Sequence, residues 1–426
     1  MRASRPRRDV RTDHRTRRRV HRRARVDARA RGLARASGSD TSSARVGRGK
    51  GRGRETRARG LESSSSGVGA SGRAMRRALR PTATRATRWA RRASGERFSG
   101  LLDREDARAP GAGGRVPVVH HDSYSAPTLP RGHRFPMGVF QRVRDALARE
   151  GIVRVGDSCS NAFSPSRRPT FEELAAAHSE EWTRTATSSE GPDAKRLREI
   201  GLPWSDVLVE RTLMEVSGTM LTVEMALECG LAVNTAGGTH HAKGTRGGGF
   251  CILNDLATAS LAVLNSGRLS RVMIVDLDVH QGDGTAEILE NEWHRCYTFS
   301  AHAASNFPAR KARSTRDVEL PRSMSDDEYM SVVSSALRES LEDFRPELVI
   351  YDAGVDVTAN DALGHLDLTF EGLYRRERMV LDTCLGSGIP VAGVVGGGYS
   401  PDLDEIANRH AVLHRVAQEM FTDHGL

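Results

Sequence analysis

The chain has 426 residues and a formal net charge of +10, and this length is enough to bury a sizeable core. Residues 1–114 hold 33 basic and 10 acidic side chains, which leaves 31 basic and 44 acidic side chains in residues 115–426. The acidic body argues against direct nucleic-acid binding by a catalytic domain and is compatible with basic ligands, such as polyamines or segments that contain lysine.

The five cysteines are scattered along the chain and form no CxxC pair. This usage is typical of a reducing compartment, and it excludes a disulfide scaffold or a cysteine-rich zinc module. No apolar run reaches the roughly 18 residues that a membrane-spanning helix needs, so we expect no membrane span.

Residues 1–114 are rich in Arg, Ala, Ser and Gly and lack aliphatic periodicity. We predict that this tail is disordered, because it cannot bury enough apolar area to offset the entropy lost on ordering. Within it, the stretch from Met75 to Ser94 carries seven arginines and no acid, which is typical of a mitochondrial or chloroplast transit peptide. Met75 is then an alternative start. The competing interpretations are a nuclear-localisation or nucleic-acid-binding arm of a nuclear or cytoplasmic protein, or an incorrectly assigned gene start.

The catalytic domain is expected to occupy residues 115–426, where short apolar runs alternate with helical patterns. The predicted strands cover 116–120, 231–234, 272–276, 296–300, 348–351 and 391–395. The predicted helices cover 137–150, 171–178, 213–227, 253–265, 326–344, 373–385 and 403–420. Thr170 with Glu173 predicts a capping box, Gly151 and Gly230 predict helix ends, and residues 191–206 are expected to form loops. The alternation, with no hairpin signal, predicts a single α/β domain with a central, mostly parallel sheet flanked by helices.

In a parallel sheet of this kind, ligands bind beyond the carboxyl ends of the strands. The strand at 272–276 ends in Asp276, Asp278 and His280, which alternate and therefore share one face. Burying two carboxylates costs several kcal/mol unless they are paired or bind a metal. The pattern favours a metal site over the alternative, a strand that simply runs into a polar loop.

Three other predicted strands also end in polar or glycine-rich segments. His240 and His241 follow 231–234, Asp352 and Asp356 follow 348–351 with Asp361 further on, and Gly396 to Tyr399 follow 391–395. Taken singly, each segment is more often a turn or a surface feature. Their occurrence at the ends of successive strands indicates a catalytic site.

These segments resemble the motifs of the zinc-dependent histone deacetylase superfamily. The matching segments are TAGGTHHA, RGGGFCILND, DLDVHQGDGT, YDAGVD with DALG, and VVGGGY, in the family's order. SAPTLPRGHRFPM and the form of the motifs are most similar to the class IV-like and related bacterial-type branch. The resemblance covers residues 115–426 and implies an arginase/deacetylase-like fold.

The resemblance also implies a role for each matching residue. It places a Zn²⁺ ion on Asp278, His280 and Asp356, a ligand set that also suits Fe²⁺. It makes His240 and His241 a proton-moving pair oriented by Asp276 and Asp283. Tyr399 becomes the phenol that stabilises the oxyanion. The substrate channel is implied at Gly249, Phe250 and Gly397, with Phe307 as a candidate opposite wall. A structural K⁺ is implied near Asp276, Asp278, His280, Ser300 and Ala301.

The implied function is hydrolysis of the amide of N-acyl-lysine in proteins by a zinc-activated water. The alternatives are an acetylpolyamine or other small-molecule amidohydrolase of the same fold, and a non-catalytic acyl-lysine-binding protein. A two-metal site of arginase type would need further acids, but Gly282 and Thr358 occupy the relevant positions. If the transit-peptide interpretation holds, histones are not the physiological substrate, and fatty-acyl lysine stays a possible one.

Overall fold

The computed structural model describes residues 100–102, 111, 113–156 and 160–426. Most of the tail predicted at 1–114, with the proposed transit peptide at Met75–Ser94, lies outside the described residues. Its disorder and the domain boundary at residue 115 therefore stay predictions. Among the described residues, no helix is long and apolar enough to cross a membrane.

The described strands form one parallel sheet, which confirms the predicted fold class. Their order across the sheet is β2-β1-β3-β8-β7-β4-β5-β6. The strands are β1 (Val118–Val119), β2 (Ala162–Phe163), β3 (Leu231–Asn234), β4 (Val272–Asp276), β5 (Cys296–Ala303), β6 (Arg316–Leu320), β7 (Leu348–Asp352) and β8 (Val391–Val394). The central strands β4 and β7 are buried at every position, as expected for a sheet covered on both faces.

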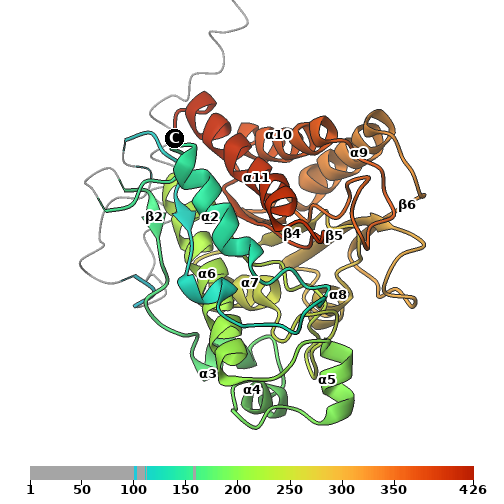
Figure 1. Ribbon diagram of the computed structural model, residues 1–426. Helices are drawn as coiled ribbons and strands as arrows, with labels where there is room; N and C mark the ends of the chain where they lie inside the picture. Colours follow the sequence, from blue (N-terminus) through green and yellow to red (C-terminus); the bar gives the residue numbers. More distant parts are fainter. Residues whose placement is uncertain (1–99, 103–110, 112, 157–159) are drawn as a thin grey trace, which may run out of the picture. The chain divides into compact units, whose positions relative to one another are not determined.

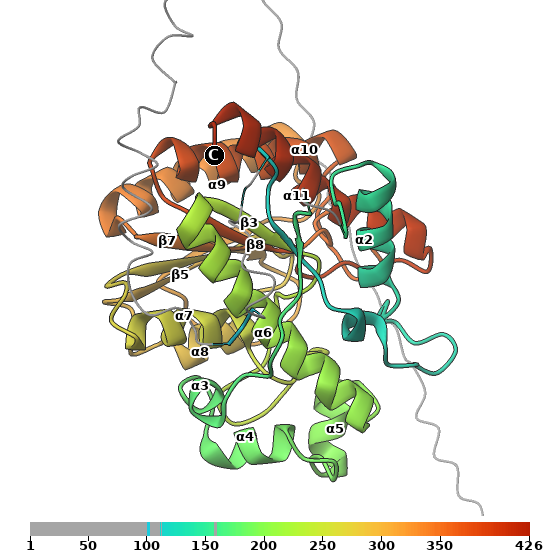
Figure 2. The same ribbon diagram turned by 90° about the vertical axis from the view of Figure 1, so that its left-hand side faces the viewer.

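Helices cover both faces of this sheet. They are α2 (Val139–Arg149), α3 (Phe171–Ala175), α4 (Glu180–Ala186), α5 (Ala194–Ile200), α6 (Asp206–Cys229), α7 (Asp255–Asn265), α8 (Asp283–Ile288), α9 (Asp326–Phe344), α10 (Phe370–Gly386) and α11 (Leu403–Asp423), with a 3-10 turn η3 at Asp122–Ser125. Helices α9, α10 and α11 pack on one face and α6 and α7 on the other (Figure 1 and Figure 2). The short helices α3, α4 and α5 lie beyond one end of the sheet, beside α6 and α7 (Figure 2).

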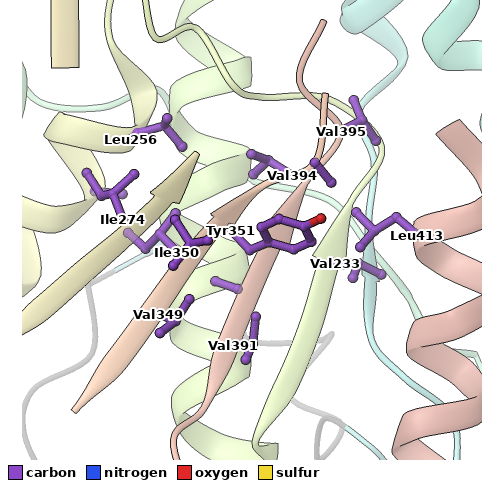
Figure 3. Packing of buried hydrophobic residues seen from close by; sticks show 14 of the residues in the cluster. Val233, Leu256, Ile274, Val349, Ile350, Tyr351, Val391, Val394, Val395 and Leu413 are labelled. Atoms are coloured by element: carbon purple, nitrogen blue, oxygen red, sulfur yellow. The ribbon is translucent and has the colours of Figure 1, made fainter. Parts of the chain in front are cut away.

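The core forms between these layers. Figure 3 shows Val233, Val391 and Ile350 on adjacent strands, with Leu256 of α7 and Leu413 of α11 on opposite sides of the sheet. β-Branched side chains suit these strands because they pack well on a pleated surface. The backbone at the carboxyl ends of the strands is thereby held by a rigid support.

Several local signals predicted the helix ends correctly. Thr170 and Glu173 form the predicted capping box of α3, and Gly230 closes α6 in a left-handed conformation. Helix α9 has the predicted bounds. Helix α6 begins seven residues before the prediction, because Ser205 accepts a hydrogen bond from Leu208 N–H and caps it there.

Other predictions of extent were wrong. Only Val118–Val119 of the predicted strand at 116–120 pairs in the sheet. The expected loop at 191–206 contains α5, which Asp193 caps. The prediction lacked α4, α8, β2 and β6 altogether, because each is short and carries little periodicity. In β6, for example, exposed and buried positions are mixed at the sheet edge.

We expect acid to destabilise the fold through His178. Its Nδ1 lies 3.0 Å from the Lys243 carbonyl oxygen, and its Nε2 accepts a hydrogen bond from Asn254 N–H. Burial lowers the pKa of His178 to about 4, so the unfolded state binds the proton first as the pH falls. The contribution of neutral His178 to the free energy of unfolding is fully present above about pH 6.5. It is lost as the pH falls toward 4, by at most about 1.4 kcal/mol per pH unit. Urea unfolding at several pH values should show a shallower pH dependence for His178→Gln. An unchanged slope would contradict this assignment.

Candidate active site

The predicted site residues gather at one edge of the sheet. Strands β3, β8, β7 and β4 are consecutive neighbours and run in the same direction, so their carboxyl ends lie side by side. Asp276 at the end of β4 is the ladder partner of Asp352 at the end of β7. The loop after β3 carries His240 and His241, and the loop after β8 carries Tyr399.

Asp278, His280 and Asp356 come together beyond β4 and β7. His280 Nδ1 lies 3.1 Å from Asp278 Oδ1 and 3.0 Å from Asp356 Oδ2. One donor atom from each of the three buried residues lies within 4.8 Å of the other two. Two carboxylates and one imidazole are a ligand set of catalytic zinc, and they leave a coordination position open.

The surrounding backbone fits a metal ion at this triad. Asp278 Oδ2 accepts a hydrogen bond from Gly397 N–H at 2.8 Å, and Asp356 Oδ1 accepts one from Val279 N–H at 2.8 Å. These bonds orient the carboxylates. A Cβ at Gly397 would lie 2.6 Å from Asp278 Oδ2 and 2.8 Å from Asp356 Oδ2, so a side chain at this position would collide with the ligands. The chemistry of the donors suits Zn²⁺ or Fe²⁺.

A second group of donor atoms lies close by, formed by His240, Asp276 and Asp352. His240 Nδ1 is hydrogen-bonded to Asp276 Oδ2 at 2.9 Å and lies 3.7 Å from Asp352 Oδ2. None of these three residues lines the cavity of about 390 Å³ described below, whereas His280 does. Of the two groups, Asp278, His280 and Asp356 are therefore better placed to hold a metal that a ligand in this cavity can reach.

The two adjacent histidines each have a carboxylate behind the ring. His240 faces Asp276, and His241 Nδ1 lies 2.8 Å from Asp283 Oδ1. The second carboxylate is itself paired, because Lys243 Nζ lies 3.1 Å from Asp283 Oδ2. This is the arrangement that the sequence implied for these four site residues. A carboxylate behind an imidazole fixes its tautomer and its orientation.

The environments of the two histidines shift their pKa values in opposite directions. Burial and the charge of His240 lower the pKa of His241 to about 4. Burial opposes a charge on His240 as well, but the carboxylates of Asp276, Asp278 and Asp352 raise its pKa well above 6.5. Neighbouring groups with divergent pKa values are suited to serve as a base and an acid. Of the two, the neutral His241 is the one able to accept a proton near neutral pH.

A cavity of about 390 Å³ leads to the metal site. Its lining residues are Arg134, His241, Gly249, Phe250, His280, Asn306, Phe307, Ala362, Leu363, His365 and Tyr399. Phe307 packs edge-to-face on His241, with ring centroids 4.9 Å apart, and Phe250 lies 6.0 Å from the Tyr399 ring. Two aromatic walls suit an alkyl chain. Gly249 has a φ of +55°, and a Cβ there would lie 2.5 Å from the His241 ring, so glycine lets the loop approach the base.

Tyr399 stands at the inner end of this channel. Its backbone N–H donates to Asp361 Oδ2 at 2.6 Å, which fixes the residue in place. Burial and the carboxylates of Asp278 and Asp356 raise the pKa of the phenol well above 10, so it stays a hydrogen-bond donor. Its hydroxyl makes no hydrogen bond with any described residue and is available to a ligand.

A smaller cavity of about 40 Å³ adjoins the channel on the interior side. The two spaces share His241, Gly249, Phe250 and Tyr399. The smaller one also contacts Gly397, and it is closed by the residues Phe135, Phe140, Arg211, Glu215, Gly237, Gly238, Thr239, His240, Cys251, Asp278 and Gly396. It has room for a group of a few atoms beyond the metal.

A buried arginine of α10 joins the two loops that carry the metal ligands. Arg376 is 0% exposed and donates to the carbonyl oxygens of Leu277 at 3.1 Å, Ala353 at 3.1 Å and Gly354 at 2.7 Å. Its charge is compensated by Glu377, with which it forms an ion pair. The acceptors lie directly before Asp278 and just before Asp356. Arg376 therefore holds the positions of both carboxylates.

Several of these residues have no role in the sequence interpretation. Arg134, Asn306 and the pair Leu363 and His365 come from three separate loops, and nothing in their local pattern indicates a common cavity. The position of Asp352 at a strand end indicated that it lies near the site. Only the structure shows that its carboxylate lies beside His240. Ser300 is the ladder partner of Asp276 and Ala301 follows it, so both lie near the site; the potassium ion stays a prediction.

Residues 133–414 match a family model described as the histone deacetylase domain. An uncharacterized protein of Picosynechococcus sp. is 46% identical over 305 residues, which covers 72% of this chain and 99% of that protein. Histone deacetylase 2 of Arabidopsis thaliana is 30% identical over 297 residues, which covers 67% of this chain and 75% of that protein.

Two solved structures share the fold. The HDA15 HD domain has a TM-score of 0.59 at 21% identity, over 71% of this chain and 88% of that chain. The HDAC homolog from Aquifex aeolicus has a TM-score of 0.59 at 21% identity, over 72% of this chain and 84% of that chain. These likenesses do not specify a branch, so the class IV-like or bacterial-type placement stays a prediction.

Arg376→Lys should weaken binding of a divalent metal by about 10-fold or more, the scale typical of residues that support metal ligands. The lysine keeps the charge beside Glu377 but cannot reach all three carbonyl groups. Metal affinity can be measured by chelator competition, with circular dichroism as a check on folding. The matched control is Arg375→Lys, because Arg375 is exposed on the same helix and pairs with Asp327. Equal affinities for both variants would refute the positioning role of Arg376.

Proposed function

Because this chain belongs to the histone deacetylase family and is a hydrolase of amide bonds, we propose that it removes short acyl groups from lysine side chains of proteins. The observation that carries this proposal is the channel between Phe250 and Phe307, which ends at the triad of metal ligands, His241 and Tyr399. The channel suits the four-carbon stem of lysine, and polar groups occur only at its inner end and its mouth. Acyl-lysine has the matching arrangement, because its apolar stem would lie between the aromatic walls and its terminal amide would reach the polar inner end.

The chemistry divides between the metal and the chain. A divalent metal held by Asp278, His280 and Asp356 supplies a Lewis acid that polarises a carbonyl group and makes water more acidic. The ligands suit zinc, with iron(II) as the alternative, and a structural potassium ion is part of the proposal. Every other contribution comes from side chains of the protein.

Those side chains act on defined atoms of the substrate. The phenol of Tyr399 donates a hydrogen bond to the carbonyl oxygen and stabilises the negative charge that develops there. His241 is neutral and accepts the proton of the attacking water, while Asp283 fixes its tautomer. The proton then passes through the histidine pair to the leaving amine. The products are a lysine residue with a free ε-amino group and a carboxylate.

The space beyond the metal supports a short acyl group. An acyl chain that enters past Tyr399 meets the cavity of about 40 Å³, whose walls include Phe135 and Phe140. This volume is enough for the methyl group of an acetyl substituent. We expect this enclosed space to disfavour a fatty chain, because forcing extra methylenes into a packed interior is unfavourable. Acetyl-lysine is the proposed substrate.

Hydrolysis of acetyl-lysine peptides should depend on Tyr399. We expect Tyr399→Phe to lower kcat by about 100-fold or more, the scale of losing one oxyanion donor, with little change in thermal stability. The rate at which the full chain, loaded with zinc, releases acetate and the deacetylated peptide measures this. A fatty-acyl peptide should react far more slowly than its acetyl counterpart.

Tyr374→Phe is the matched control. This variant removes the hydroxyl by which Tyr374, on the surface of α10, donates a hydrogen bond to Glu419 of α11. It should keep the wild-type rate. Near-wild-type turnover by Tyr399→Phe would reject the proposed role of the phenol, and absence of turnover by the wild-type protein on every acyl-lysine peptide would reject the function.

We also propose that the protein works in a mitochondrion or chloroplast. The support is the arginine-rich, acid-free stretch from Met75 to Ser94. Mass spectrometry of the protein isolated from its own cells should find a mature N-terminus after Met75. An intact Met1 on protein from nuclei would overturn the proposal and favour the nuclear or cytoplasmic alternative.

A further inference from the structure

The mouth of the channel is free of acidic side chains, although residues 115–426 contain 44 of them. None of the residues that line the channel cavity is Asp or Glu. A second cavity, of about 580 Å³, adjoins the first and shares Arg134, Ala362, Leu363 and Tyr399 with it. Its lining contains no acid either and is mostly apolar, with Leu129, Met137 and Leu403 among it. A substrate that enters here meets no carboxylate before the metal site.

Arg134 lies at the junction of the two cavities. Its neighbours anchor the loop, because His133 Nε2 lies 2.9 Å from the Gly201 carbonyl oxygen and the Phe135 ring packs on Phe250. Arg134 itself is exposed and makes no hydrogen bond or ion pair with any described residue. The anchored backbone thus presents an uncompensated guanidinium group beside the entrance.

Two further cations lie around the same entrance. Arg322 Nη2 lies 3.2 Å from Nδ1 of His365, a lining residue, and Lys311 donates to the carbonyl oxygens of Asn306 and Pro308. Neither cation has a carboxylate within 4.0 Å among the described residues. The pKa of His365 is lowered by its partial burial and by Arg322, as expected where the local potential is positive. The mouth therefore attracts anions and repels cations.

We propose that the mouth selects acyl-lysine residues that have an acidic residue next to them in the sequence, whose carboxylate binds Arg134. This inference rests on the proposed lysine deacylation. The apolar cavity takes the alkyl part of the flanking peptide, and the guanidinium group binds the carboxylate through two parallel hydrogen bonds. Acylated polyamines carry additional ammonium groups and no carboxylate, so the same mouth disfavours them.

Three acetyl-lysine peptides that differ only in the residues beside the acetyl-lysine test the proposal on the full, zinc-loaded chain. These residues are Asp, Asn or Lys. We expect kcat/KM for the Asp peptide to exceed that for the Lys peptide by about 10-fold at low ionic strength, with the Asn peptide between them. The preference should shrink at about 1 M salt, because salt screens charges over about 3 Å there. N8-Acetylspermidine should react more slowly than the Asn peptide.

Variants locate the effect. Arg134→Gln should reduce the ratio of kcat/KM for the Asp peptide to that for the Lys peptide, and Arg134→Glu should reverse this preference. The matched control is Arg338→Gln. Arg338 lines a separate cavity beside Arg271 and Glu347, next to the amino ends of β4 and β7. The Arg338→Gln variant should therefore keep the preference of the wild-type protein.

The outcomes separate the two levels of the proposal. If the Asn peptide is hydrolysed but the Asp and Lys peptides react equally, or acetylspermidine reacts as fast as the peptides, the inference about the mouth is overturned and the deacylase function stands. If no peptide is hydrolysed, the proposed function fails and the inference falls with it.

Discussion

Negative charge is concentrated at the carboxyl ends of β4 and β7, where Asp276, Asp278, Asp352 and Asp356 are each at most 3% exposed. Ladder pairing makes this unavoidable, because Asp276 and Asp352 are partners and the two metal-ligand carboxylates follow on the adjoining loops. Buried carboxylates so close together cannot all stay ionised without compensating positive charge. A divalent cation at Asp278 and Asp356, a charged His240 beside Asp276, and a strongly raised pKa at Asp352 together satisfy that constraint.

The same constraint explains the rigid scaffold around the site. Carboxylates that bind a metal must keep their positions in its absence, and here backbone N–H groups, glycines and the buried Arg376 hold them. The side chains to which we assign catalytic roles extend from this support: His241 is fixed through Asp283, and Tyr399 through Asp361. The mouth, built from loops that include Arg134, lies outside this buried group of charges. The preference that we propose there therefore concerns the choice of substrate and not the chemical step.

The sequence predicted the chemical centre better than its surroundings. Metal and proton chemistry require particular residue types at short spacing, so Asp276, Asp278 and His280 were visible at the end of one buried strand and just beyond it. Strands β3 and β4 and helix α9 were predicted with their observed bounds, since apolar runs and capping residues define them locally. Edge strand β6 lacks an apolar run, and helix α5 is capped by Asp193 but is only seven residues long, too short for a clear helical period. The mouth was not predictable either. The net charge of the chain does not show where its acidic side chains lie. Arg134, Asn306 and His365 are far apart in the sequence and are brought to one cavity only by the fold.

The central claim is that Asp278, His280 and Asp356 hold a single divalent metal at the end of the channel. Anomalous diffraction at the zinc absorption edge, from crystals of the zinc-loaded protein, tests it most directly. We expect one strong peak per chain, bounded by His280 Nδ1 and the carboxylates of Asp278 and Asp356. A peak between His240, Asp276 and Asp352 instead, two peaks at the site, or none at the triad would contradict it.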